Sequence, residues 1–180
     1  MQQIRLFCVV FNIVAFKIVL LIKAFRVGNG YDVHLLAEGL PLWLGGIRIE
    51  HTKGCVAHSD GDVLIHALCD ALLGALALGD IGKHFPDSSA EFKGIDSKIL
   101  LERTYSMVKE RGYKLVNADC TLLLQRPKVA PYINLMRETL ASVMGVEVGR
   151  VSVKATTTEG AGFVGREEGV AVYATVLLQG

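Results

Sequence analysis

The segment from Asp62 to Leu78 restricts the possible folds of this chain more than any other. It is rich in alanine and leucine, Ser59 or Asp60 precedes it as a helix N-cap, and Gly79 follows it as a terminator. Nearly all of its side chains are of the type found in protein cores. The segment therefore predicts a helix that contributes most of its surface to the core of a domain.

The remaining segments predict strands and two further helices. A strand over residues 25–31 leads into a turn at Gly28-Asn29-Gly30, and other strands cover 45–49, 114–125, 151–156 and 169–178. One helix begins after Asp96 as N-cap, and another has Pro131 in its first turn. This order favours one α+β domain over residues 25–180, in which helices pack on one face of a mixed β-sheet in a ferredoxin-like arrangement.

The start of the chain differs from this pattern. Residues 1–25 contain 19 apolar residues, no acidic residue and three basic ones. The apolar run from Leu6 to Phe25 is about as long as the ~20 residues that span a bilayer, but Asn12 and Lys17 interrupt it, which argues against membrane association. We interpret residues 1–24 as an apolar extension outside the fold, with a membrane-associating helix and a targeting segment as alternatives.

Charge and cysteine content exclude several classes of protein. The chain has 19 basic and 18 acidic residues, a net charge of +1, which argues against a nucleic-acid-binding protein. The four cysteines are too sparse for a disulfide framework and have no metal-ligand spacing, which favours a reducing cytosol. We therefore expect a cytoplasmic location for a bacterial protein, or a plastid-type organelle for a eukaryotic one.

Two polar clusters are candidate sites for an ion or a phosphate. Asp32 and His34 are two residues apart in an extended segment, so their side chains point to the same side; a turn aspartate beside a surface histidine would look the same. Asp62, His66 and Asp70 share one helix face at i, i+4 and i+8. A histidine on such an apolar helix is more often a core residue, but His58 at the helix N-terminus, where unpaired N–H groups attract anions, shifts the balance towards a site.

A third polar cluster runs from Lys154 to Gly160 and continues to Arg166. Three consecutive threonines and a glycine-rich stretch place hydroxyl and backbone N–H groups together, which suits phosphate oxygens. Glu159 offers an oxygen ligand for a magnesium-type ion, and Arg166 offers a guanidinium that can grip a phosphate. A polar strand exit followed by a flexible loop is the alternative interpretation.

Together these segments resemble the 2-C-methyl-D-erythritol 2,4-cyclodiphosphate synthase family. The resemblance extends in order over residues 26–180, and its matching runs are GYDVH (30–34), HSDGDVLIHALCDALLGALALGDIG (58–82), FPD (85–87), QRPK (125–128) and KATTTEGAGFVGREEG (154–169). It implies a homotrimer with sites at subunit interfaces. It also implies an enzyme that converts 4-diphosphocytidyl-2-C-methyl-D-erythritol 2-phosphate to the 2,4-cyclodiphosphate and CMP, in non-mevalonate isoprenoid biosynthesis.

The same resemblance assigns the metal-binding and catalytic residues. Asp32, His34 and His66 correspond to zinc ligands, which agrees with the catalytic-zinc pattern of three protein ligands and one open position. Glu159 corresponds to the ligand of a second divalent ion, Mg²⁺ or Mn²⁺. His58 and Thr157 correspond to catalytic residues that orient the phosphates and stabilise the transition state.

The substrate-binding residues implied by the resemblance lie in several stretches of the chain. Ser89 stands where the family commonly has an aspartate, which puts that one contact in doubt. The full set is Asp32, His34, His58, Ser59, Asp80, Ile81, Gly82, Phe85, Pro86, Asp87, Ser88, Ser89, Leu124, Gln125, Arg126, Pro127, Lys128, Val129, Ala130, Thr156, Thr157, Thr158, Glu159, Phe163 and Arg166.

Three questions stay open at the level of sequence. A metal-dependent phosphodiesterase would use the same zinc and phosphate groups with water as the nucleophile. A non-catalytic trimer that binds nucleotides is a second alternative. The apolar alternation of Val170, Val172 and Ala174 fits a strand that faces other subunits, and it fits equally well a strand that faces the core of its own subunit.

Overall fold

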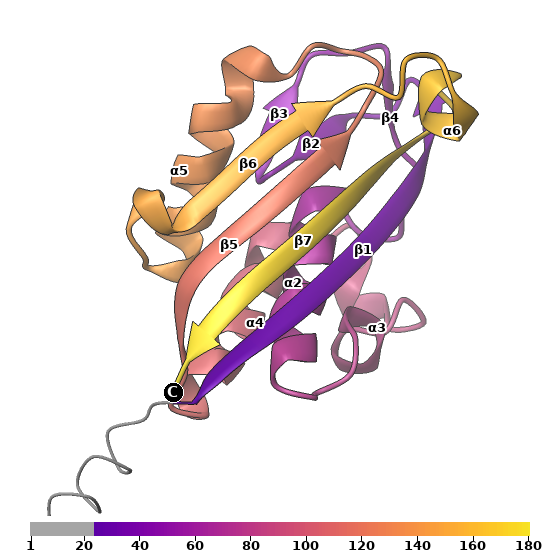
Figure 1. The fold of residues 1–180 in the computed structure, drawn as a ribbon. Helices are drawn as coiled ribbons and strands as arrows, with labels where there is room; N and C mark the ends of the chain where they lie inside the picture. Colours follow the sequence, from indigo (N-terminus) through magenta and orange to yellow (C-terminus); the bar gives the residue numbers. More distant parts are fainter. Residues whose placement is uncertain (1–23) are drawn as a thin grey trace, which may run out of the picture.

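The computed structural model describes residues 24–180, which form a five-stranded mixed sheet covered by helices (Figure 1). The strand order is β4-β1-β7-β5-β6, and every neighbouring pair is antiparallel except β5 and β6, which are parallel. A separate hairpin consists of β2 and β3. The strands are β1 (Phe25–Glu38), β2 (Leu42–Leu44), β3 (Ile47–Ile49), β4 (Lys53–Cys55), β5 (Lys114–Leu123), β6 (Val151–Thr156) and β7 (Gly169–Gln179).

The three long helices lie on one face of this sheet, which confirms the predicted α+β arrangement (Figure 1). They are α2 (Val63–Ala75), α4 (Ser97–Glu110) and α5 (Ile133–Met144). The connections contain the short helices α3 (Ile81–His84) and α6 (Gly162–Gly165) and the 3-10 turns η1 (Ala90–Phe92), η2 (Ala130–Tyr132) and η3 (Val148–Arg150).

Local sequence signals explain where these helices begin and end. Asp96 caps α4 as predicted, and Pro131 lies in η2 directly before α5. The N-cap of α2 is Asp62 instead of Ser59 or Asp60, because its carboxylate accepts a hydrogen bond from the Ile65 amide at 3.0 Å. The helix ends at Ala75, before Leu78, because the amide of Leu76 already turns back to the carbonyls at the helix end.

The glycines of β1 mark a helix contact, and the turn predicted at residues 28–30 is wrong. Strand β1 runs unbroken through these residues to Glu38, and α2 packs directly on it. A Cβ atom at Gly28 would lie 1.8 Å from the carbonyl oxygen of Ala71, and one at Gly30 would lie 2.0 Å from that of Ala67. Only glycine therefore allows the backbone of α2 to approach the strand this closely.

The ferredoxin-like topology is also wrong, although the composition of the layers is right. A ferredoxin-like sheet has the chain order βαββαβ, and its two helical crossovers each join strands that have another strand between them. Here β7 separates β1 from β5, but β5 and β6 are direct neighbours joined through α5. Because β6 pairs in parallel with β5, the connection through α5 is an ordinary βαβ unit between neighbouring strands. Strand β7 then lies between β1 and β5.

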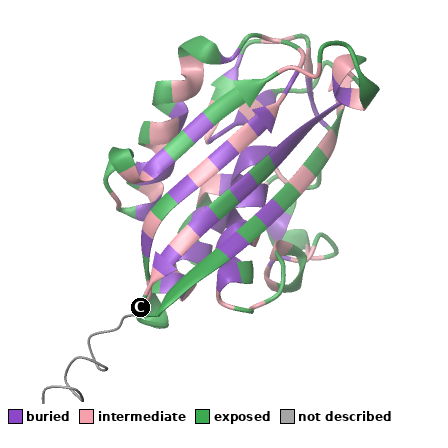
Figure 2. Ribbon diagram, in the orientation of Figure 1, coloured by how far each residue is buried: buried purple, intermediate pink, exposed green. Residues whose placement is uncertain are grey.

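The two faces of the sheet differ in what covers them (Figure 2). Val170, Val172 and Ala174 are 0% exposed and face the helices, so the open question about this alternation is answered in favour of the subunit's own core. The opposite face keeps large apolar side chains in contact with solvent, among them Val27 (68% exposed), Tyr31 (44%), Val33 (42%) and Tyr173 (49%).

The predicted extension over residues 1–24 lies outside the described residues, apart from Ala24. Across residues 24–180, no helix combines the length and the apolar character that crossing a membrane requires.

Candidate metal and phosphate site

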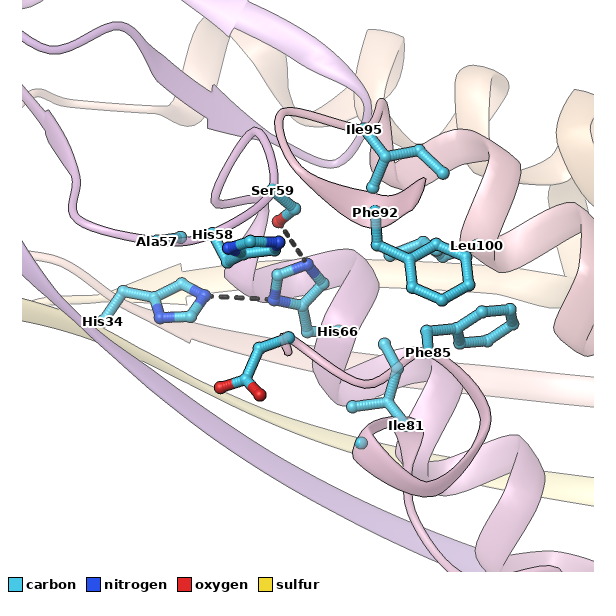
Figure 3. Close-up of a pocket in the computed structure, with 12 residues that line it drawn as sticks. His34, Ala57, His58, Ser59, His66, Ile81, Phe85, Phe92, Ile95 and Leu100 are labelled. Carbon is cyan, nitrogen blue, oxygen red and sulfur yellow. Dashed lines mark hydrogen bonds between the residues drawn. The ribbon is translucent and has the colours of Figure 1, made fainter. Parts of the chain in front are cut away.

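Side chains from β1 and α2 meet in a compact group of metal-ligand type. His66 Nδ1 lies 3.0 Å from His34 Nε2 (Figure 3) and 3.2 Å from Asp32 Oδ2. His34 Nε2 in turn lies 3.3 Å from Asp32 Oδ2. Within residues 24–180 this is the only cluster of three or more His, Cys, Asp or Glu side chains that can share one ion. The two predicted β1 ligands and the predicted α2 ligand are therefore brought together.

The local structure explains this convergence. Gly28, Gly30, Asp32 and His34 alternate along β1 and share the face that meets α2. The two glycines admit the helix, and the next two residues on that face then meet His66, whose side chain projects from the first turns of α2.

The electrostatics of the cluster favour the protonation states that a metal ion needs. Burial acts to raise the pKa of Asp32, but the neighbouring imidazoles of His34 and His66 outweigh it and leave this pKa below its usual range. Burial lowers the pKa of His34 below its usual range, against the opposing effect of Asp32. An ionised carboxylate and a neutral imidazole are the forms that bind metal.

The cluster opens into a cavity of about 320 Å³ (Figure 3). Seven of the predicted substrate residues line this cavity together with His66, and His58 also approaches the carbonyl of Ser89 through its Nε2 at 3.3 Å. Ala57, Phe92, Ile95 and Leu100 complete the wall. The predicted residues that line it are His34, His58, Ser59, Ile81, Gly82, Phe85 and Asp87, one of which, His34, also belongs to the metal cluster.

The other two carboxylates on the His66 face of α2 have structural partners. Asp62 is fully buried and accepts hydrogen bonds from the amides of Gly45 and Gly46 as well as Ile65; burial raises its pKa. Asp70 accepts a hydrogen bond from the Ile81 amide at 2.7 Å, and burial also raises its pKa. The shared helix face thus contains one metal-ligand candidate and two side chains that hold neighbouring loops.

The nucleotide and threonine segments form a second group of predicted residues. A hollow of about 350 Å³ is lined by Leu124, Pro127, Lys128, Val129, Ala130, Ile133, Ala155, Thr156 and Thr157. Gln125 and Arg126 line an adjoining hollow that includes His51. The hydroxyl of Thr157 donates to Glu159 Oε1 at 2.5 Å, and the Glu159 side chain is exposed.

The remaining predicted residues lie near these two groups. Arg166 pairs with Glu168 at 2.8 Å, and the Thr158 hydroxyl donates to the carbonyl of Ala161. Phe163 packs against Gly169 at the start of β7. Asp80 caps α3 and Ser89 caps η1, while Pro86 and Ser88 lie in the loop between these elements.

The sheet keeps the two groups apart within one chain. In the strand register Thr156 pairs with Leu123, Leu123 with Ala171, and Ala171 with Val33. Three steps between strands separate the end of β6 from the metal-ligand segment of β1, about 14 Å at the usual strand spacing. The predicted site residues therefore form two half-sites, which we name the metal half-site and the threonine half-site.

Some residues around the metal half-site escaped the sequence analysis. Phe92, Ile95 and Leu100 line the cavity from a segment without a recognisable motif. Ser97 contacts His66 directly, and Asp60 contacts Ser97. Asp60 lies inside the matched run at 58–82, but its position predicts only a helix cap. The only sequence signal near Ser97 is its position directly after Asp96 at the start of a predicted helix. That position indicates a helix cap, but it does not show which side chains Ser97 contacts.

Comparison with known proteins identifies the family. A model of the YgbB family matches residues 25–179. The chain belongs to the YgbB family. Among relatives, it is 60% identical over 154 residues to the 2-C-methyl-D-erythritol 2,4-cyclodiphosphate synthase of Parabacteroides distasonis, covering 86% of this chain and 96% of that protein.

Solved structures of YgbB relatives have the same fold. The bifunctional IspDF from Campylobacter jejuni superposes with a TM-score of 0.84 at 45% identity, over 87% of this chain and 42% of that chain. A CDP-bound 2C-methyl-D-erythritol-2,4-cyclodiphosphate synthase superposes with a TM-score of 0.79 at 40% identity, over 85% of this chain and 99% of that chain. The family resemblance and the prediction of a cyclising synthase are thereby confirmed.

Proposed function

We propose that this protein converts 4-diphosphocytidyl-2-C-methyl-D-erythritol 2-phosphate to 2-C-methyl-D-erythritol 2,4-cyclodiphosphate and CMP, as a step of non-mevalonate isoprenoid synthesis. The observation that carries the proposal is the Asp32, His34 and His66 cluster, which opens into a cavity in a chain of the YgbB family. The cyclodiphosphate synthase relatives supply the substrate class.

The ligand set of the metal half-site fits zinc. Two imidazole nitrogens and one carboxylate oxygen lie within 4.8 Å of one another, and His34 and His66 both line the cavity from which a further ligand would come. Zinc held there would act as a Lewis acid that polarises a phosphate oxygen. In the threonine half-site, Glu159 would hold the second divalent ion, Mg²⁺ or Mn²⁺.

The reaction needs no protein nucleophile, because both reacting groups belong to the substrate. An oxygen of the 2-phosphate bonds to the β-phosphorus, and the bond from that phosphorus to the CMP oxygen breaks. His58 and Ser59 orient the phosphates at the cavity. The Thr157 hydroxyl, which donates to Glu159 in the structure, would turn its one proton to the diphosphate once Glu159 holds the ion. The contribution of the chain is to fold the substrate into a reactive geometry and to offset the repulsion between its phosphates.

A homotrimer would join the half-sites that one chain keeps apart. The threonine half-site of one subunit would meet the metal half-site of its neighbour, with the 124–130 segment around the cytidine. The exposed apolar face of the sheet, with Val27, Val33 and Tyr173, supplies the surface that such an assembly would bury. Residues 1–24 would stay outside this domain.

The proposed location is the cytoplasm. Cys55, Cys69 and Cys120 are buried as free thiols, and burial raises the pKa of each thiol to about 12. Such thiols fit a reducing compartment, and the matched relative of Parabacteroides distasonis is bacterial.

The activity is tested by ³¹P NMR of the products formed from the diphosphocytidyl substrate, with and without a chelator. We expect CMP and a cyclic diphosphate in equal amounts, and loss of both when the metal is removed. A linear methylerythritol bisphosphate product would identify a metal-dependent phosphodiesterase instead. Tight binding of the substrate without turnover would identify a non-catalytic protein, and either outcome would overturn the proposal.

A further inference from the structure

A buried serine, Ser97, and a half-buried aspartate, Asp60, lie behind the metal cluster and support its helical ligand, His66. His66 faces Asp32 and His34 through Nδ1, and its other ring nitrogen, Nε2, lies 3.0 Å from the hydroxyl oxygen of Ser97. That hydroxyl oxygen lies 2.5 Å from Oδ1 of Asp60. Ser97 is 0% exposed, and neither Ser97 nor Asp60 lines the cavity.

The hydrogen bonds of this pair fix the direction of each donor. An ionised carboxylate only accepts hydrogen bonds, so the single hydroxyl proton of Ser97 must point to Asp60. The Ser97 oxygen then presents a lone pair to His66, and Nε2 of His66 must carry the ring proton. In the neutral imidazole this leaves the lone pair on Nδ1, the nitrogen that faces Asp32 and His34.

The backbone holds Asp60 in this role. Its Oδ2 accepts the Ser97 amide at 2.9 Å, and its Oδ1 also accepts the Asp62 amide at 3.2 Å. The carboxylate therefore links the start of α2 to the start of α4, and it cannot rotate away from the Ser97 hydroxyl without losing both bonds.

We propose that Asp60 and Ser97 are positioning residues that hold His66 in the Nε2–H tautomer and aim its Nδ1 at the metal. A histidine ligand that donates its second N–H to a fixed acceptor binds metal more strongly and in one orientation. The inference rests on the proposed metal function of Asp32, His34 and His66, and it adds two residues that touch neither metal nor substrate.

The same geometry assigns a direction to Ser59. Its hydroxyl oxygen lies 3.2 Å from His66 Nε2 (Figure 3) and accepts the Gly61 amide at 3.1 Å. Because Nε2 already carries a proton, it cannot accept one from Ser59. The Ser59 hydroxyl proton is therefore free to point into the cavity that this residue lines, where a phosphate oxygen can accept it.

The test compares Ser97→Ala with Thr104→Val in the zinc-loaded full-length protein. Thr104 is a second fully buried hydroxyl on α4, and none of the hydrogen bonds described for Asp32, His34 and His66 involves it, so its loss should not reach the metal. We expect the zinc affinity of Ser97→Ala, measured by chelator competition, to fall about 10–100-fold. The affinity of Thr104→Val should match wild type. Equal affinities in all three proteins, or an equal loss in both variants, would overturn the proposal.

Two spectroscopic readouts separate positioning from simple folding defects. The visible spectrum of the cobalt-substituted protein should shift in Ser97→Ala and stay unchanged in Thr104→Val. If Ser97→Ala does not fold, ¹⁵N-histidine NMR of the zinc-loaded wild type decides. It should show a slowly exchanging, hydrogen-bonded Nε2–H on His66, and a rapidly exchanging proton would contradict the inference. If wild type binds no zinc at all, the metal assignment itself fails.

Discussion

At the residue scale, the buried carboxylate of Asp62 connects three parts of the fold. It caps α2 and accepts the amides of Gly45 and Gly46 at the turn between β2 and β3. The residue that sequence spacing placed beside His66 thus stabilises the frame around the site without entering it.

We predict that Asp62→Ala lowers the free energy of unfolding by about 3 kcal/mol, from the lost cap and two stranded backbone donors. Chemical denaturation measures this loss. Asp96→Ala is the matched control, because Asp96 also caps a helix through one amide but is half-exposed, and it should cost about 1 kcal/mol or less. Equal losses in the two variants would show that the extra contacts of Asp62 contribute nothing.

The two proposed metal sites can be separated by single substitutions. His66→Ala removes one of three clustered ligands and should lose most bound zinc together with activity. Glu159→Gln leaves that cluster intact, so it should keep full zinc while its activity falls and recovers in part at high magnesium or manganese. Metal analysis of the purified proteins checks both expectations. Full zinc in His66→Ala, or zinc loss in Glu159→Gln, would contradict the assignment.

Sequence reasoning succeeded for residues whose role depends on local spacing. Asp32 and His34 share a side because they are two apart on a strand, and Asp96 caps the helix that follows it. It did not find Ser97, because the contact with His66 joins residues 31 positions apart and depends on how α4 packs on α2. Contacts of this kind follow from tertiary packing and leave no local pattern.

At the scale of elements, the contact of α2 with β1 sets the geometry of the metal half-site. The helix backbone touches the strand at Gly28 and Gly30, two and one side-chain positions before Asp32 on the same face. Any residue that moves the helix away from the strand would therefore also move His66 away from its partners. The same two glycines also predict a turn, because glycine is suited both to turns and to close packing of backbones.

We predict that Gly30→Ala destabilises the protein by about 2–3 kcal/mol, because its methyl group has to displace the Ala67 carbonyl. It should also weaken zinc binding. Gly74→Ala, in helix α2, is the control. Its added methyl group meets only Asn29 O at 3.8 Å, and alanine favours a helix over glycine by about 0.5–1 kcal/mol. Thermal unfolding and zinc titration follow both effects. A fully stable, zinc-binding Gly30→Ala would refute this role of the glycine.

The strand order of the sheet could not be predicted from the individual elements. The types of the long elements were correct, apart from the turn expected at residues 28–30 inside β1, because each element has its own periodicity or cap. The strand order was wrong, because the pairing of β6 beside β5 and of β7 between β1 and β5 depends on contacts between distant segments. That same order decides that the threonine half-site lies across the sheet from the metal half-site.

At the scale of the whole molecule, one chain holds the two half-sites apart. The metal half-site lies between β1 and α2, and the threonine half-site lies at the end of β6 beside the 124–130 segment. The exposed apolar face of the sheet offers a surface on which subunits can associate. If the active site is shared between subunits, two variants that are each defective in a different half-site should regain activity when they are mixed. A site within one chain cannot do this.

The most direct measurement mixes two defective variants, His66→Ala and Thr157→Val, after unfolding them together and refolding. Each variant alone should have little activity. In mixed trimers, about a quarter of the sites would combine an intact His66 from one subunit with an intact Thr157 from its neighbour. We predict that CMP release recovers to about that fraction of the wild-type rate. A mixture that forms trimers by light scattering but stays as inactive as its components would contradict the shared site.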